Sequence, residues 1–156
     1  MMKVCLFAVG KLRKSPEREI FNRYKLRFEN IGKSINLFPF EVTQFDDLKW
    51  NRYLTEKKWG NTFSEKSYKI LLDEKGVNIS SRGFANKLLQ IRDEGFKETL
   101  FFIGGAAGVP QKFKDMFNFK ICFGDMVWPH MMARLMLMEQ MYRAGTIIGG
   151  LPYHKD

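Results

Sequence analysis

Short apolar runs alternate with segments of helical periodicity along most of the chain. Five runs each predict a buried strand, at residues 4–9, 35–42, 68–72, 99–103 and 119–123. Between several of them, apolar residues recur three or four positions apart, which is the spacing of one helix face. Strands that alternate with helices form a mostly parallel sheet covered by helices, so the order predicts an α/β fold. We expect a single domain over residues 1–156, a length that can bury one core.

Local signals mark where the helices begin and end. The predicted starts are Ser15-Pro16-Glu17, Ser80 or Ser81, Pro110 and Pro129. The predicted ends are Gly32, near Gly95 and about Ile148. Pro39 cannot donate a ladder hydrogen bond, so the strand at 35–42 is expected at the sheet edge.

Two stretches outside these elements are less regular. Residues 73–76 are polar and are expected to form a turn that ends the third strand. Residues 45–67 could form a helix plus a loop. They hold Trp50, Tyr53, Trp59 and Phe63 among lysines.

The charge of the chain favours a polyanionic partner. Lys and Arg number 26 against 17 Asp and Glu, a formal net charge of +9. Basic residues gather on one face of the helix that starts at Ser15 and just before it, at Arg13, Lys14, Arg18, Arg23, Lys25 and Arg27. A basic but inert surface is the alternative. A membrane surface is less favoured, because no polybasic run adjoins an amphipathic anchor.

The cysteines indicate the cellular compartment of the protein and whether a metal site is expected. Cys5 and Cys122 are the only cysteines, and neither has a second Cys or His at metal-ligand spacing, so no metal site is expected. Two thiols without a disulfide framework suit the cytoplasm. The chain begins without a signal-peptide pattern, and no apolar run is long enough to span a bilayer.

A glycine-rich turn follows the fourth predicted strand. Residues 104–108 read Gly-Gly-Ala-Ala-Gly and lead into the helix at Pro110. Glycines let the backbone approach a ligand, and in open α/β sheets ligands bind at the carboxyl ends of strands. The turn lacks both the P-loop and the G-x-G-x-x-G patterns, which disfavours a P-loop NTPase and a nicotinamide oxidoreductase. A ligand site and a plain strand-to-helix turn both remain open.

A second loop, residues 123–130, leaves the fifth strand and precedes the long helix. Two such loops from neighbouring strands could enclose one pocket. His130 lies in the first turn of that helix, and it could equally be a capping or core histidine. The helix itself is apolar on several sides, which predicts either a central core position or a homodimer interface.

The tail after the long helix carries Pro152-Tyr153-His154-Lys155. Its side chains could stack on a base, handle a proton and hold a phosphate. A frayed terminus is the alternative.

Several of these segments resemble one family. FFIGGAAG at 101–108, ICFGDMVWPHMMARLMLMEQMYRA at 121–144 and PYHK at 152–155 resemble the bacterial ribosomal RNA pseudouridine N3-methyltransferases of the SPOUT class. KILLDEKGVNISSRGFA at 69–85 and VCLFAVGKL at 4–12 fit the same family. The resemblance runs over nearly the whole chain.

The resemblance implies a SPOUT-type Rossmann-like sheet with a C-terminal trefoil knot, a homodimer and S-adenosyl-L-methionine as cofactor. It implies methylation of N3 of a pseudouridine in 23S ribosomal RNA, with ribosomal RNA or the 70S ribosome as partner. The matching cofactor positions are Leu72, Gly104, Phe123, Gly124, Asp125, Met126, Val127 and Trp128. Arg82 departs from the family, which often has an acid there, and Asp125 and Trp128 fall in a variable part.

A catalytic set follows as a hypothesis. His154 would accept the N3 proton, Tyr153 would stack on or orient the base, and Arg134 would stabilise the developing anion. Two rivals remain: a non-catalytic ribosome-associated RNA-binding protein, and a SPOUT methyltransferase that acts on another RNA such as transfer RNA.

Overall fold

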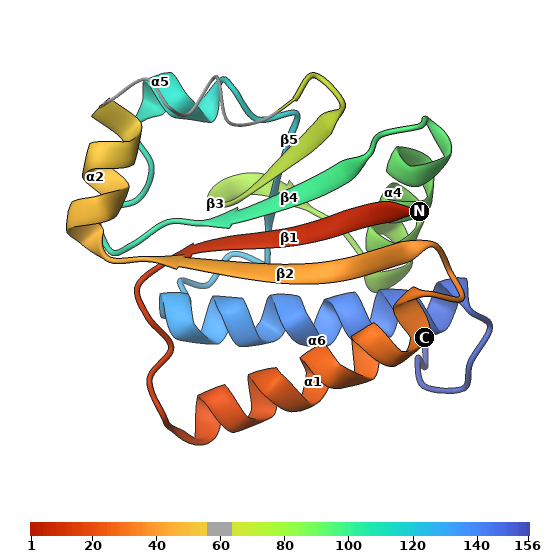
Figure 1. Ribbon diagram of the computed structural model, residues 1–156. Coiled ribbons are helices and arrows are strands. Elements are labelled where there is room, and N and C mark those ends of the chain that lie inside the picture. Colours follow the sequence, from red (N-terminus) through yellow and green to blue (C-terminus); the bar gives the residue numbers. More distant parts are fainter. Residues whose placement is uncertain (56–63) are drawn as a thin grey trace.

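The chain folds into one parallel sheet with helices on both faces (Figure 1). The computed structural model describes residues 1–55 and 64–156. Within these ranges the strands are β1 (Met2–Val9), β2 (Leu37–Phe45), β3 (Ser67–Asn78), β4 (Glu98–Ile103) and β5 (Phe119–Cys122). The helices are α1 (Pro16–Gly32), α2 (Asp47–Thr55), α4 (Ser81–Asp93), α5 (Gln111–Lys114) and α6 (His130–Ile148). The α/β prediction is confirmed.

The strands lie in the order β2-β1-β4-β3-β5, and each pairs in parallel with its neighbours. The position of β2 at the edge confirms the expectation from Pro39, because an edge strand can leave one side of its backbone without ladder bonds. Two predicted caps are also present. The Ser15 hydroxyl accepts from the Arg18 amide at 3.2 Å, and Ser80 accepts from the Gly83 amide at 3.0 Å.

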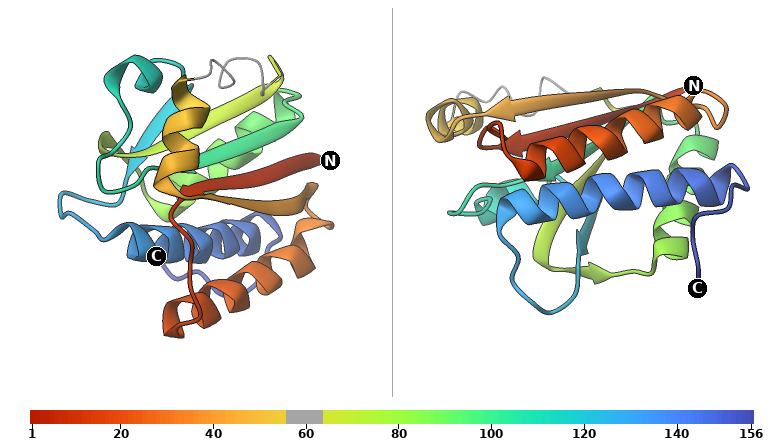
Figure 2. Two further views of the ribbon diagram at one scale, coloured as in Figure 1. Left: turned by 60° about the vertical axis from the view of Figure 1, so that its left-hand side comes forward. Right: turned by 90° about the horizontal axis from the view of Figure 1, so that it is seen from below.

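Two apolar layers hold the helices on the sheet. Helices α1, α4 and α6 cover one face, where Phe28, Leu88 and Met141 are fully buried. Helices α2 and α5 lie toward the other face, where Trp50 and Phe117 are buried (Figure 2). This arrangement leaves the carboxyl ends of the strands at one edge, which is where a ligand would bind.

Strand β3 is longer than the sequence predicts. The predicted end at Leu72 is wrong, because the strand resumes and pairs again through Asn78. Ile121 of β5 is in register with both Leu72 and Val77, so residues 73–76 form an excursion between the two pairings. A Cβ at Gly76 would lie 2.5 Å from the Ile121 carbonyl carbon, so the lack of a side chain there permits the close approach.

The irregular stretch at 45–67 contains helix α2 near its start, in agreement with the predicted helix. Trp50 of this helix is buried against Phe45. Trp59 and Phe63 lie outside the described residues. None of the helices in ranges 1–55 and 64–156 is both long and apolar enough to cross a membrane.

The long helix α6 combines the two environments proposed for it. It packs side by side with α1 and also against α4 (Figure 1). Leu137, Met138 and Met141 are buried in the core, whereas Met132 is 37% exposed. The helix is therefore both a core element and a source of exposed apolar surface.

Candidate active site

The two loops singled out in the sequence line one cavity of about 540 Å³. Residues 104–108 after β4 form one side of it, and Phe123 with residues beyond it forms another. Their strands are not neighbours, however, because β3 lies between β4 and β5. The expectation of adjacent strands is wrong, yet the pocket forms, because β3 contributes its own segment to the wall.

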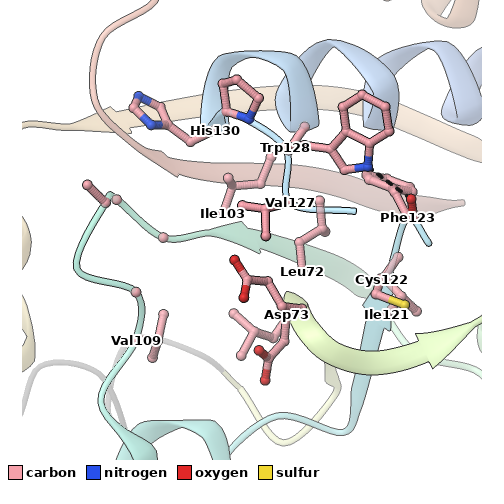
Figure 3. A pocket seen from close by; sticks show the side chains of 18 of the residues that line it. Leu72, Asp73, Ile103, Val109, Ile121, Cys122, Phe123, Val127, Trp128 and His130 are labelled. Carbon is pink, nitrogen blue, oxygen red and sulfur yellow. Dashed lines mark hydrogen bonds between the residues drawn. The ribbon is translucent and has the colours of Figure 1, made fainter. Parts of the chain in front are cut away.

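The walls of the cavity combine an apolar patch with polar groups. Figure 3 shows Leu72, Ile103 and Val127 close together, with Val109 farther along the same hollow. These side chains come from β3, β4 and both loops, so three separate segments build one surface. A hollow of this size that joins an apolar patch to polar groups is the usual form of a cofactor site.

The glycine turn presents backbone rather than side chains to the cavity. A Cβ at Gly105 would lie 3.0 Å from Val9 Cγ1 and 3.1 Å from Asp47 Oδ1, so the turn packs tightly against its neighbours. Gly108 has φ +70°, a conformation that favours glycine. The result is a narrow turn whose peptide groups can approach a ligand.

The loop at 123–128 is closed by a hydrogen bond of its own. The Trp128 indole Nε1–H donates to the Phe123 carbonyl at 3.0 Å, drawn as a dashed line in Figure 3. Gly124 has φ +92° at the point where the chain leaves β5. All predicted cofactor residues line the cavity except Asp125, which is exposed in the same loop.

The excursion in β3 adds two acids that sequence reasoning did not assign to the site. Asp73 and Glu74 line the cavity, and Asp73 pairs with Lys114 of α5 at 3.2 Å. Both acids follow a buried strand at its carboxyl end, which is the signal that could have identified them. They add two carboxylates to the pocket wall beside the Lys114 ammonium.

His130 also lines the cavity, at the start of α6. The side chain is exposed, so His130 is not a core histidine. The N-terminus of α6 has no side-chain capping hydrogen bond. Cys122, with a free thiol, lines another part of the cavity.

Arg134 is placed beneath the turn that follows β1, outside the cavity lining. It is 1% exposed. Its Nη2 donates to the carbonyls of Val9 at 3.2 Å and Gly10 at 2.9 Å, and its Nη1 donates to Gln44 Oε1 at 3.1 Å. Burial lowers the pKa of this guanidinium.

The tail is ordered against α6 rather than frayed. Tyr153 donates to Glu139 Oε1 at 3.0 Å, and His154 Nδ1 lies 3.3 Å from Arg143. Burial, followed by hydrogen bonding with Tyr24 and Glu139, raises the pKa of Tyr153. Neither tail residue lines the cavity.

The predicted catalytic set is therefore divided within one protomer. The anchors of the tail on α6, Glu139 and Arg143, lie five and nine residues beyond Arg134, or about 8 and 14 Å along the helix. The structure brings the cofactor positions together but keeps Tyr153 and His154 apart from them.

The basic face predicted for α1 is present. Arg13, Lys14, Arg18 and Arg23 are exposed, and Arg27 lies over the Tyr24 ring at 5.6 Å. Lys25 pairs with Glu29 at 2.8 Å. Among the described residues, no cluster of three or more His, Cys, Asp or Glu could hold a metal ion.

Comparison with known proteins assigns the family. A family model described as "Predicted SPOUT methyltransferase" matches residues 2–154. Proteins named Ribosomal RNA large subunit methyltransferase H are 40% identical in Cereibacter sphaeroides, 41% in Dinoroseobacter shibae and 43% in Ruegeria sp., each over 155 residues and 99% of both chains. A match of this extent and identity covers both loops and the tail. The chain belongs to the SPOUT methyltransferase family.

Proposed function

We propose that this protein transfers a methyl group from S-adenosyl-L-methionine to N3 of a pseudouridine in 23S ribosomal RNA, on the assembled ribosome. The observation that carries the proposal is the single cavity enclosed by the glycine turn, the β3 excursion and the loop at 123–128. Family membership and the rRNA methyltransferase names of relatives at about 40% identity support the same activity.

The cavity fits the methyl donor. Its apolar wall at Leu72, Ile103 and Val127 suits an adenine ring, and the peptide groups of the glycine turn suit polar ligand atoms. Asp73 and Glu74 at the edge suit ribose hydroxyls or a cationic group. When bound, S-adenosyl-L-methionine supplies a methyl group already activated by its sulfonium centre.

The chain's own residues then position the base and remove a proton. Tyr153 can stack on the base, and His154 can take the N3 proton. Positioning supplies much of the rate in such a transfer. The Nη atoms of Arg134 already bind backbone and Gln44 oxygens, so a direct role for it on the developing anion requires exchange of those bonds.

The basic face of α1 would hold phosphates of the RNA. The segment between β1 and α1 carries Arg13 and Lys14, and the first turn of α1 carries Arg18. Helix α1 begins at the same edge of the sheet as the cavity. Phosphate contacts of this kind give affinity and orientation, whereas the choice of nucleotide comes from contacts to the base and RNA shape.

A homodimer would complete the site. A second hollow of about 530 Å³ runs along α6 and is lined by Tyr24, Phe84, Met132, Leu135 and Met136 among others. Exposed apolar surface on this scale commonly marks an interface, and most homodimers use one patch twice about a twofold axis.

The same hollow reaches both the cofactor cavity and the residue that holds the tail. Phe123 and Gly124 line it at one end and also line the cofactor cavity, whereas Glu139, which holds Tyr153, lines the other end. A twofold axis across the hollow would exchange these ends. The tail of one protomer would then face the cofactor cavity of its partner.

Two further expectations belong with this proposal. We infer a cytoplasmic location, supported by the free thiols of Cys5 and Cys122. The trefoil knot implied by the resemblance stays a prediction.

Methyl transfer to ribosomes tests the proposal directly. Calorimetry would measure binding of S-adenosyl-L-methionine, and 70S ribosomes from a strain lacking the enzyme would be incubated with labelled donor. Mass spectrometry of the digested RNA should locate one methyl group on a 23S pseudouridine. Absence of donor binding would favour the non-catalytic RNA binder, and label in transfer RNA alone would favour a different target.

A further inference from the structure

The His154 imidazole is held at both ring nitrogens. Nδ1 lies 3.3 Å from Arg143 Nη1, and Nε2 lies 3.1 Å from Asp156 Oδ1. The side chain is 13% exposed, so little of the ring reaches solvent. A neutral imidazole carries one N–H donor and one acceptor, so these two contacts determine which nitrogen bears the proton.

The chemistry of the two partners determines which ring nitrogen donates and which accepts. The Arg143 guanidinium has donors and no acceptor, so Nδ1 must accept from it. An ionised Asp156 carboxylate only accepts, so Nε2 must donate. Hydrogen bonding to Arg82, and then to His154, lowers the pKa of Asp156 to about 2, which keeps this carboxylate ionised at any working pH.

Arg82 determines where the Asp156 carboxylate lies. Its Nε donates to Oδ1 at 2.6 Å and its Nη2 donates to Oδ2 at 2.7 Å, a bidentate pair. Arg82 is in the first turn of α4, and the end of the tail lies beside that helix in Figure 2. The contacts therefore run from α4 through Asp156 and His154 to Arg143 on α6.

Arg143 is itself fixed, which anchors the other side of the ring. It donates to Glu139 Oε1 from Nη2 at 2.6 Å and from Nε at 3.0 Å, and it lies 4.8 Å from the centre of the Tyr153 ring. The same Glu139 oxygen accepts from Tyr153. The imidazole is thus held between two independently ordered ion pairs.

We propose that Arg82 and Asp156 are positioning residues that hold His154 as the Nε2–H tautomer and so make Nδ1 its basic atom. The catalytic meaning of this arrangement rests on the proposed function. A proton lost from base N3 would pass to Nδ1 once Arg143 releases it, while Nε2–H stays bonded to Asp156. The resulting imidazolium would face a carboxylate, which stabilises it.

Nitrogen-15 NMR of the imidazole rings in the labelled full-length protein tests the tautomer without RNA or methyl donor. The chain has 2 histidines, so His130 is an internal reference and a His154→Gln variant assigns the signals. At a pH where His154 is neutral, wild-type protein should show an unprotonated, pyridine-type Nδ1 and a protonated, pyrrole-type Nε2.

The variants act on exposed side chains and should fold normally, since Arg82 is 55% and Asp156 69% exposed. Asp156→Ala and Arg82→Gln should move the His154 nitrogen shifts part of the way toward the average of the two tautomers, because Arg143 alone still favours the Nε2–H form, and should leave His130 unchanged. Arg82→Lys keeps the charge without the bidentate geometry and should give an intermediate shift. Asp93→Asn, at the other end of α4, should change nothing.

A protonated Nδ1 in wild-type protein, or unaltered His154 shifts in Asp156→Ala, overturns the proposal. Because the spectra need no substrate, failure of ribosome methylation would count against the proposed function alone. If both hold, Asp156→Ala should lower kcat while the affinity for S-adenosyl-L-methionine stays unchanged.

Discussion

Arg134 Nη2 donates to the Gly10 carbonyl at 2.9 Å and so joins two residues that lie 124 positions apart in the sequence. The bond ties the first turns of α6 to the end of β1, next to the cavity. It also explains how a cation can be almost completely buried without a carboxylate partner, because backbone carbonyl oxygens and Gln44 accept from both Nη atoms. The buried Nε has no hydrogen-bond partner among the described residues.

Arg134→Ala should destabilise the fold. The change leaves the carbonyls of Val9 and Gly10 without this donor and removes buried volume, so we expect a loss of about 3 kcal/mol in the free energy of unfolding. Urea denaturation measures it. Arg23→Ala removes an exposed arginine and should stay within about 0.5 kcal/mol of wild type. Equal losses in both variants would show that the buried contacts contribute nothing.

Gly76→Ala should disturb the junction of β3 and β5. The new Cβ would lie 2.5 Å from the Ile121 carbonyl carbon, which is backbone and cannot swing aside, so a loss of at least about 2 kcal/mol is expected. Gly145→Ala is the matched control. Its Cβ would meet the flexible end of Ile31 at 2.6 Å and the Phe28 ring at 3.3 Å, and alanine favours the helix, so it should cost less than the change at Gly76. Thermal or urea unfolding measures the loss of stability in both variants. A larger loss in Gly145→Ala than in Gly76→Ala would contradict the prediction.

Trp128→Phe should weaken binding of S-adenosyl-L-methionine while folding stays intact. The variant keeps an aromatic ring but loses the indole bond to the Phe123 carbonyl that closes the loop, worth about 1 kcal/mol, so the Kd should rise at least roughly five-fold. Calorimetry provides the measurement. Asp125→Ala, in the same loop but outside the cavity lining, should bind as wild type does. Weaker binding by Asp125→Ala, with unchanged binding by Trp128→Phe, would contradict the role given to the indole hydrogen bond.

Replacing Arg18 and Arg23 together by Gln should reduce the salt dependence of ribosome binding. Each phosphate contact contributes a little under one to the slope of log K against log salt concentration, so the slope should fall by about 1.5 to 2. Lys97→Gln is a control at the opposite, amino edge of the sheet, next to the start of β4. A slope that changes only in the Lys97 variant would place the RNA on the other edge.

Two inactive variants should restore activity when mixed, if the tail acts on the partner's cavity. Leu72→Trp fills the cavity, and His154→Ala removes the proton acceptor. In a twofold dimer, random exchange makes half of the molecules mixed, and each mixed dimer keeps one intact site. Specific activity should recover to about a quarter of wild type. No recovery, with subunit exchange verified by mass spectrometry, would mean that each tail serves its own protomer.

Much of the fold could be predicted because it depends on local signals. Ser15 and Ser80 cap helices where expected, since a cap is a contact over three residues, and Pro39 indicated an edge strand because it lacks a backbone donor. The two loops of the site were found for the same reason: each follows directly from a strand and carries glycine. Asp73 and Glu74 were missed because a polar run after an apolar strand looks the same whether the strand ends or resumes.

The sequence by itself determined the alternation of strands and helices, most of their boundaries and the two turns around Gly104 and Phe123, because hydrophobic period and capping act within a few residues. Only the tertiary structure decided that β3 separates β4 from β5, that residues 73–76 line the cavity, and that Tyr153 and His154 lie on the far part of α6. These relationships join residues that are distant in the chain. They depend on which buried surfaces pack together and which donors find acceptors. A local sequence pattern does not contain that information.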